Sequence, residues 1–363
     1  MSGFNSLQYF CAISPIDVVI DAFINEEQKK MLSTSDDHCA WSIRSQGRFA
    51  TLMASRSENI VDGKEIDWST IQFVPSERYV RKLVMRYTTR LELQGREVED
   101  DNLASLICFL SRSRISNLPD PTSHCNATYF VPLSTSYCQC EQNDDELQLT
   151  IRIYPQHNDV GVAKVWEAGA ALAEYIIHNR TIIKGRNVVE LGAGVGLTGL
   201  VAAAFGAKSI HMTDYTDATL ENLSHNVTIN ESWLRNRGVD PSTVNVGQLE
   251  WGEHSESSRD ISTISALQNA DIMIAADVVY AVECIPDLVS TVYKFLLTGY
   301  NKLALFATTH RNMTTFSLFE TELEKKRIAR DYVPQDSLPL VLPCYFNQPR
   351  TDVRICIMKQ NEK

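Results

Sequence analysis

Several features are lacking in this chain, and each absence excludes a class of protein. No run of about 18 apolar residues occurs, so we expect no membrane-spanning helix. Positions 8–20 are fairly apolar, but Pro15 and Asp17 interrupt them and no basic start precedes them, unlike a secretory signal peptide. The nine cysteines follow no repeated spacing, which argues against a disulfide framework. We therefore predict a cytoplasmic protein.

Clustered basic charge is lacking as well. The net charge is −11 and the isoelectric point is near 5.3. Such a chain is not suited to coating nucleic acid, so we predict no nucleic-acid partner and favour a protein partner. Cys138 and Cys140 form the only close cysteine pair, and no second pair or close histidine completes a zinc site. We therefore predict no metal.

The chain does have the length and apolar content for a sizeable core. Its 363 residues, of which 44% are hydrophobic, suffice for about two domains. Residues 1–115 are predicted to form a helical N-terminal region. Residues 116–160 are predicted to be a linker with β-strands, and residues 161–363 to form the main domain. A monomer is the default expectation.

Two helices are expected in the N-terminal region. One follows Pro75-Ser76 and carries an apolar stripe at helical spacing, formed by Val80, Leu83, Val84, Tyr87 and Leu91. The second covers residues 101–112. Further along, residues 129–131 and the alternating stretch 146–154 predict strands.

From residue 161 onward, strand and helix patterns alternate. Nearly all-apolar strands are expected at 187–191, 209–214, 243–250, 271–277 and 302–308, and β-like stretches at 339–345 and 352–358. This pattern predicts an α/β fold with a doubly wound parallel sheet covered on both faces. Ligands of such sheets bind outside the carboxyl ends of the strands.

A glycine-rich segment follows the first of these strands. Gly192, Gly194 and Gly196 stand at every second position and lead into an apolar helix. Glycine lets the backbone pass close to a flat ligand, and the N–H groups of the next helix can hold an anion. The segment therefore predicts a nucleoside-bearing cofactor.

Two cofactors fit these glycines. Gly194-x-Gly196-x-x-Gly199, with Asp214 about 20 residues later, matches the fingerprint of NAD-binding proteins. Three features favour S-adenosylmethionine instead: Glu190 directly before the glycines, the run from Asp277 to Tyr280 at the end of a strand, and flat indole faces at Trp166 and Trp251. Alternatives stay open, because Trp251 can be a packing residue and Asp214 can cap the next helix.

Four segments carry a resemblance to a known family. They are Trp166-Glu-Ala-Gly-Ala-Ala-Leu, Glu190-Leu-Gly-Ala-Gly-Val-Gly-Leu-Thr-Gly, Gln248-Leu-Glu-Trp251 and Ala275-Ala-Asp277-Val-Val-Tyr280. Together they resemble the seven-strand protein-lysine methyltransferases with an Asp-x-x-Tyr motif. Within that family the chain is similar to the branch that acts on elongation factor 2, a translation factor. The resemblance is strong over residues 160–310 and loose before residue 70.

This resemblance implies a Rossmann-like sheet of seven strands, a lysine acceptor on elongation factor 2, and an extra helical N-terminal region. We predict that this region recognises the substrate. The resemblance implies that Asp277 and Tyr280 form the catalytic acceptor site. It also implies that S-adenosylmethionine is held by Trp166, Glu190, Gly192, Ala193, Gly194, Asp214, Trp251 and Ala276.

Other interpretations of these residues remain. Asp277 can cap the strand turn while Tyr280 only packs, Arg311 and Asn312 fit a solvated loop, and Cys284 fits a core cysteine. The chain can also act on another protein or a small molecule, or bind a partner without catalysis. A nicotinamide oxidoreductase is a further alternative, although no proton-donating pair for hydride transfer is evident.

Overall fold

The computed structural model describes residues 16–33, 41, 43–53, 77–112, 120–131, 148–252, 261–335 and 353–360. The chain forms two compact units, and the boundary falls between Tyr129 and Phe130. The boundaries predicted from the sequence, at residues 115 and 160, stay predictions. The expected signals at Pro75-Ser76 and residues 339–345, and the pair Cys138 and Cys140, lie outside the described residues.

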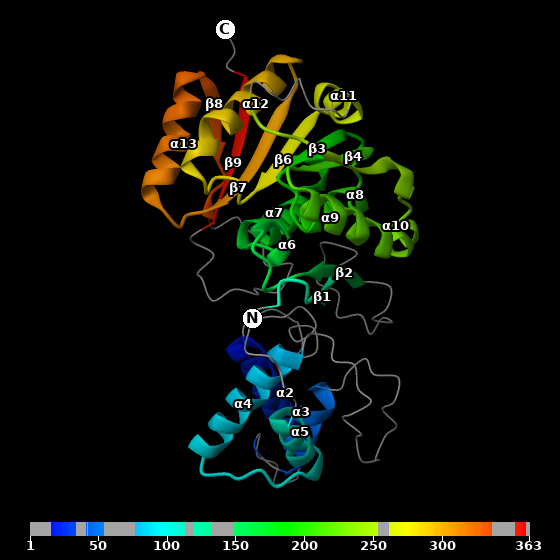
Figure 1. The fold of residues 1–363 in the computed structure, drawn as a ribbon, viewed down its shortest axis with the longest axis vertical. Coiled ribbons are helices and arrows are strands. Elements are labelled where there is room, and N and C mark those ends of the chain that lie inside the picture. Colours follow the sequence, from blue (N-terminus) through cyan, green and yellow to red (C-terminus); the bar gives the residue numbers. More distant parts are fainter. Residues whose placement is uncertain are drawn as a thin grey trace. The chain divides into compact units, whose positions relative to one another are not determined.

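The N-terminal unit is helical, as predicted (Figure 1). Its described elements are α2 (Ile16–Ser33), α3 (Ile43–Met53), α4 (Glu77–Leu93), α5 (Asp101–Arg112) and most of β1 (Cys125–Phe130). The predicted stripe is confirmed as the buried face of α4. Tyr87 from this face stacks on Phe49 of α3 with 3.7 Å between ring centroids, and Phe23 of α2 packs edge-on against both rings. Aromatic packing thus joins three helices in one core.

The second unit is centred on a seven-stranded sheet with the order β5-β4-β3-β6-β7-β9-β8. The strands are β3 (Asn187–Leu191), β4 (Ser209–Asp214), β5 (Val244–Gln248), β6 (Ile272–Ala276), β7 (Leu303–Thr309), β8 (Ile328–Tyr332) and β9 (Val353–Gln360). The pairs among β3 to β7 are parallel, whereas β9 runs antiparallel to both neighbours. The predicted Rossmann-like α/β fold is confirmed, with β9 as the exception to parallel pairing.

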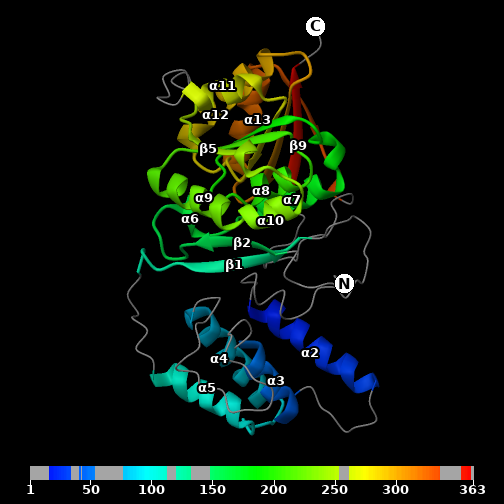
Figure 2. The ribbon, with the colours of Figure 1, turned by 90° about the vertical axis from the view of Figure 1, so that its right-hand side faces the viewer.

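Helices cover both faces of this sheet (Figure 2). On one face lie α7 (Glu167–His178), α8 (Leu197–Ala204) and α9 (Asp217–Ile229), and on the other lie α11 (Ile261–Asn269), α12 (Ile285–Leu297) and α13 (Met313–Lys325). Smaller elements are β2 (Gln148–Ile153), α6 (Val160–Ala163), α10 (Glu231–Asn236) and the 3-10 turns Arg180–Ile182, Pro241–Thr243 and Val282–Cys284. Burial on two faces explains why the central strands are almost entirely apolar.

The sheet arrangement gathers the carboxyl ends of β3, β4, β5 and β6 at one edge. At the ends of β3 and β6 the chain changes direction through residues with positive φ, Gly192 and Asp277. Polar residues that follow each strand in the sequence therefore come together at this edge. Among the described helices, none is both long and apolar enough to cross a membrane.

Candidate active site

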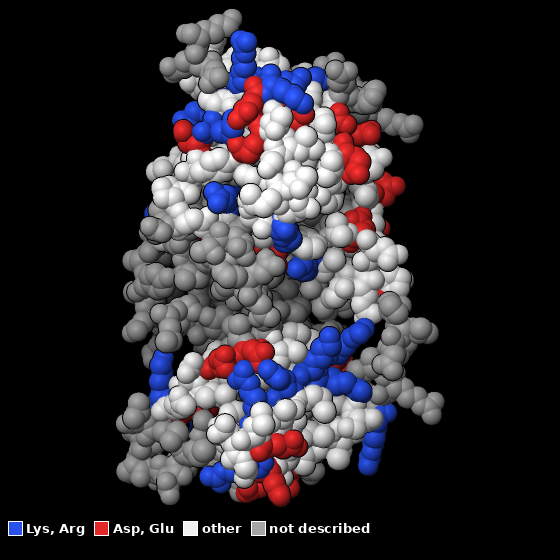
Figure 3. Space-filling view, turned by 90° about the vertical axis from the view of Figure 1, so that its left-hand side faces the viewer, with Lys and Arg blue, Asp and Glu red and all other residues white. Residues whose placement is uncertain are grey.

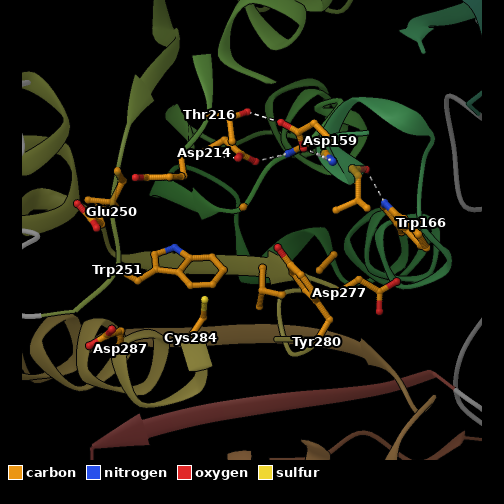
Figure 4. A pocket seen from close by; sticks show the side chains of 18 of the residues that line it. Asp159, Trp166, Asp214, Thr216, Glu250, Trp251, Asp277, Tyr280, Cys284 and Asp287 are labelled. Carbon is orange, nitrogen blue, oxygen red and sulfur yellow. Dashed lines mark hydrogen bonds between the residues drawn. The ribbon is translucent and has the colours of Figure 1, made fainter. Parts of the chain in front are cut away.

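A cavity of about 570 Å³ opens where these strand ends meet (Figure 4). Eight of the ten predicted site residues line it: Trp166, Gly192, Gly194, Asp214, Trp251, Ala276, Asp277 and Tyr280. Residues that the sequence did not single out also line it, among them Asp159 and Asp287. A volume of this size suits a ligand as large as a nucleoside with a side chain.

The glycine loop passes close to its neighbours. Gly192 and Gly194 have φ values of 60° and 55°, in the left-handed region that other residues rarely adopt. A Cβ on Gly192 would lie 2.8 Å from Val278 Cγ1 and 3.4 Å from the Trp251 ring, and one on Gly194 would lie 3.1 Å from the Gly161 carbonyl oxygen. The loop therefore forms a smooth wall with no room for a side chain.

Asp214 closes the same wall from the end of β4. One of its carboxylate oxygens accepts the Gly194 N–H at 2.9 Å and the other accepts the Tyr215 N–H at 2.8 Å. Burial raises the pKa of this carboxyl, and these backbone hydrogen bonds act against that rise. The N-cap of α9 is Thr216, which accepts the Thr219 N–H, so the interpretation of Asp214 as the cap is wrong.

Asp159 joins the cavity from the turn before α6. Its carboxylate accepts the Gly161 N–H at 2.8 Å and the hydroxyl groups of Thr216 and Thr219. Burial alone would raise the pKa of Asp159, but the hydrogen bonds from these three residues outweigh burial and lower it. The turn before α6 is thereby fixed to the beginning of α9.

The two tryptophans stand on different sides of the cavity (Figure 4). Trp251 packs against the hydrophobic core beside Gly192 and is only partly buried. Trp166 is the N-cap residue of α7, and its indole N–H donates to the Val160 carbonyl oxygen at 3.1 Å. The Trp166 ring has Lys164 Nζ at 4.2 Å from its centroid and the Arg311 guanidinium carbon at 5.1 Å.

The carboxylate of Asp277 accepts hydrogen bonds from three residues. One oxygen accepts the Thr309 N–H at 2.8 Å. The other accepts the Thr309 hydroxyl at 3.0 Å and the Ala168 N–H and Arg311 guanidinium, each at 3.3 Å. Only 6% of the side chain is exposed. Asp277 therefore ties the end of β7 and the beginning of α7 to the turn after β6.

Tyr280 and Cys284 lie toward the open side of the cavity. Tyr280 is 60% exposed. Its partial burial is the largest cause of a raised pKa of its hydroxyl, and the charges of the nearby Cys284, Asp214 and Asp159 raise that pKa further. Cys284 is exposed and lines the cavity, so its interpretation as a core cysteine is wrong. It is the last residue of the turn Val282–Cys284 and directly precedes α12.

Two predicted cofactor residues do not line the cavity. Glu190 is buried behind the glycine loop. This burial raises the pKa of its carboxyl well above the ordinary value, and the charge of Asp214 raises it further. The Ala193 N–H donates to the Thr213 carbonyl oxygen at 2.9 Å, which holds the loop on β4. Both residues support the loop from behind, and a direct role in cofactor binding stays a prediction.

Arg311 and Asn312 lie in the exposed loop between β7 and α13, as one interpretation of the sequence had it, but both side chains have partners. The Arg311 guanidinium contacts the carboxylates of Glu167 and Asp277. The Asn312 side chain caps α13 by accepting the Thr314 N–H at 2.8 Å. Asparagine directly before an amphipathic stretch is a known cap signal and could have revealed Asn312. No local signal pointed to the partners of Arg311.

The charge of the lining decides which cofactor fits. Five carboxylates line the cavity, those of Asp159, Asp214, Glu250, Asp277 and Asp287, against the single cation of Arg311. Such a surface disfavours the anionic diphosphate of NAD and favours a ligand with positive charge. S-adenosylmethionine carries a positive sulfonium and an ammonium group, so the carboxylates that line the cavity and its volume fit this cofactor.

The comparison with known families agrees with this geometry. Residues 143–325 match the family model described as lysine methyltransferase. The chain belongs to this lysine methyltransferase family. The protein is therefore an S-adenosylmethionine-dependent protein-lysine methyltransferase, and the nicotinamide oxidoreductase that the glycine spacing left open is ruled out.

Individual relatives support the assignment of this methyltransferase. It is 30% identical over 271 residues to the mouse protein-lysine N-methyltransferase EEF2KMT, covering 73% of this chain and 74% of the relative. The Bos taurus protein of the same name is 27% identical, with 73% and 76% covered. This chain is also 30% identical to the protein N-terminal and lysine N-methyltransferase efm7 of Aspergillus fumigatus, covering 46% of this chain and 64% of the relative. The predicted family membership and cofactor are confirmed.

Replacing Gly192 by alanine is expected to weaken S-adenosylmethionine binding about tenfold, because its Cβ would displace Val278 and push the loop into the cavity. Equilibrium binding of the cofactor by calorimetry measures this loss. Gly185→Ala is the matched control, since Gly185 also has a positive φ, 70°, but a Cβ there has no described atom within 4 Å. An affinity of Gly192→Ala as high as that of Gly185→Ala would mean that Val278 and the loop accommodate the new Cβ without loss of cofactor binding.

Proposed function

We propose that this methyltransferase modifies a lysine of elongation factor 2, and that Asp277 and Tyr280 form its acceptor site. The observation that supports the acceptor site most directly is the acidic cavity itself, with Asp277 at its base and Tyr280 toward its opening. The similarity of the chain to the branch that acts on elongation factor 2, and the relatives named EEF2KMT, support elongation factor 2 as the acceptor.

The rim of the cavity suits a macromolecular acceptor. Val160, Tyr215 and Tyr280 line the cavity, yet 47%, 58% and 60% of their side chains are exposed. Large apolar side chains grouped at an opening are typical of surfaces that another protein covers. Aromatic residues in particular supply contact area at interfaces. The rim thus favours a protein over a small molecule.

The cofactor supplies a methyl group on positively charged sulfur, which only a neutral amine can accept. A free lysine with a pKa of about 10.4 costs about 4–5 kcal/mol to deprotonate at pH 7. Removal from water in the cavity lowers the pKa of the amine. Asp277 orients the amine, and Tyr280 flanks it with its ring and hydroxyl. Trp166, Gly192, Gly194, Asp214, Trp251 and Ala276 hold the cofactor.

The N-terminal unit is part of this proposal as the region that recognises the acceptor. Arg78, Lys82, Arg86 and Arg90 stand four residues apart on α4 and form one stripe. Asp17 of α2 pairs with Arg86 and Arg90, whereas Arg78 and Lys82 are exposed. Figure 3 shows Lys and Arg side chains gathered on this unit. In a chain of net charge −11, such a stripe suits an acidic surface of the acceptor.

The proposal is tested with radiolabelled S-adenosylmethionine on purified elongation factor 2, beside a whole cytosolic extract. Label on the factor, absent with an inactive Asp277 variant, is the expected result. Label on another protein would refute the acceptor and keep the activity. In the same assay, replacing Arg78 and Lys82 together by glutamate is expected to raise KM for the factor with kcat unchanged. An unchanged KM would refute the role of the N-terminal unit.

A further inference from the structure

Two cations lie over the Trp166 ring, and two carboxylates pair with these cations. Lys164 and Arg311 both lie over the ring and both contact the carboxylate of Glu167, Lys164 at 3.4 Å. Arg311 also contacts Asp277 at 3.3 Å. The four residues, which we call the Trp166 quartet, come from the turn before α7, from α7, and from the segments that follow β6 and β7. Their two positive and two negative charges sum to zero.

Burial within the Trp166 quartet is uneven. The carboxylates of Glu167 and Asp277 belong to side chains that are 12% and 6% exposed, whereas Lys164 and Arg311 are 42% and 36% exposed. A buried carboxylate without a partner is costly, and its charge is weakly screened. Arg311 is the only residue of the four that contacts both buried acids. Its planar guanidinium suits this bridging position and the face of the indole ring.

The charge balance matters for an amine that enters the cavity. A carboxylate without a counter-charge stabilises an ammonium group beside it and hinders loss of the proton. The other titratable groups that face Asp277 across the cavity are Asp159, Asp214, Tyr280 and Cys284, with Glu250 and Asp287 further along its lining. None of these is a cation. Within the described lining, Arg311 is therefore the group that offsets the charge of Asp277.

We propose that Arg311 is a positioning residue that neutralises Asp277, so that a lysine side chain entering the cavity gives up its proton there. The same guanidinium keeps the Asp277 carboxylate turned toward Thr309 and Ala168. The amine proton leaves to water, and no covalent bond to Arg311 or Asp277 forms. This inference rests on the proposed acceptor site, because it requires the amine to arrive next to Asp277.

The first test replaces Arg311 by methionine, which preserves a long stem over Trp166 and removes the charge. Single-turnover methylation is measured from pH 6 to 10 with enzyme and cofactor saturating. The acidic limb of the rate profile is expected to move upward by about one pH unit, as for loss of one close counter-charge. Arg311→Lys keeps the charge and is expected to keep the limb in place, even if its plateau rate falls. A purely structural role would lower the plateau of Arg311→Met without moving the limb.

Glu167→Gln provides a test of opposite sign. It removes one negative charge from the Trp166 quartet, so the acidic limb is expected to move downward by a similar amount. This variant keeps the size of the side chain and guards against an Arg311→Met protein that fails to fold. Limbs that move in the same direction in both variants, or in neither, would overturn the inference.

A readout without turnover uses calorimetric proton release. The acceptor is bound to enzyme loaded with the demethylated cofactor S-adenosylhomocysteine, in two buffers of different ionisation enthalpy. Wild type is expected to release more protons per acceptor at pH 8 than Arg311→Met, and equal release would overturn the inference. If the wild-type enzyme labels a protein other than elongation factor 2, these measurements are made on that protein, so that loss of the proposed acceptor and loss of this inference are separate outcomes. A wild-type enzyme that labels no protein would overturn both.

Discussion

Replacing Asp277 by asparagine is expected to lower the single-turnover rate about 100- to 1000-fold, because the acceptor amine loses the charged group that orients it. The melting temperature is expected to fall less than with alanine at this position, although the asparagine amide nitrogen cannot accept the Ala168 N–H or the Arg311 guanidinium. Asparagine tolerates the positive φ of 54° at this position, and its side-chain oxygen can still accept the Thr309 N–H. Rapid-quench methylation and thermal unfolding measure the two quantities.

Asp277→Ala is the companion variant that separates chemistry from architecture. It is expected to lose the same rate and also stability. Alanine in the left-handed region costs about 1–2 kcal/mol, and a buried Thr309 N–H without its acceptor costs about 1–3 kcal/mol more. If Asp277→Asn retained the wild-type rate, Asp277 would be only the structural tie between α7 and β7, and the acceptor site would lie elsewhere.

Replacing Gly199 by alanine is expected to destabilise the second unit by about 2–3 kcal/mol, a typical cost of overpacking a core. Gly199 lies in the first turn of α8, against β3 and β4. A Cβ there would lie 2.3 Å from Met212 Sδ and 2.4 Å from Glu190 Oε2, and both side chains are buried. Urea unfolding followed by circular dichroism gives the change in free energy of unfolding.

Gly169→Ala on the facing helix α7 is the matched control. A Cβ at Gly169 would have its nearest contact at 3.6 Å, with the Thr198 hydroxyl oxygen, which is ordinary van der Waals distance. In a helix this change removes flexibility of the unfolded chain and is expected to stabilise by about 0.5–1 kcal/mol. If Gly199→Ala were as stable as this control, Met212 and Glu190 would have to move aside at little cost.

The central part of the sheet could be read from the sequence because its signals are local. Strands β3 and β4 have the bounds that the apolar runs predicted. Strand β8 was missed because Ala329, Arg330 and Asp331 give it no apolar run, and much of it is exposed. The antiparallel direction of β9 was equally hidden, since an apolar strand carries no mark of its direction.

In the candidate site, too, features with a local sequence signal could be predicted and features that depend on distant residues could not. The glycine loop and the residues directly after strand ends could be predicted, because topology alone brings them to one edge. Arg311 could not, because its partner Glu167 lies 144 residues away in sequence and only the folded sheet brings them together. Asp159 was missed for the same reason, since Thr216 and Thr219 are 57 and 60 residues from it.

The placement of Trp166 and Trp251 gives the cavity optical reporters of its own. Indole emission depends on nearby charge and on contact with water, and these two rings border the cavity, whereas Trp233 is buried away from it. Two cations lie over the Trp166 ring, so its emission responds to any change in their arrangement. Occupancy at the two ends of the cavity can therefore be followed as separate fluorescence signals, without a label, once either ring is replaced by phenylalanine.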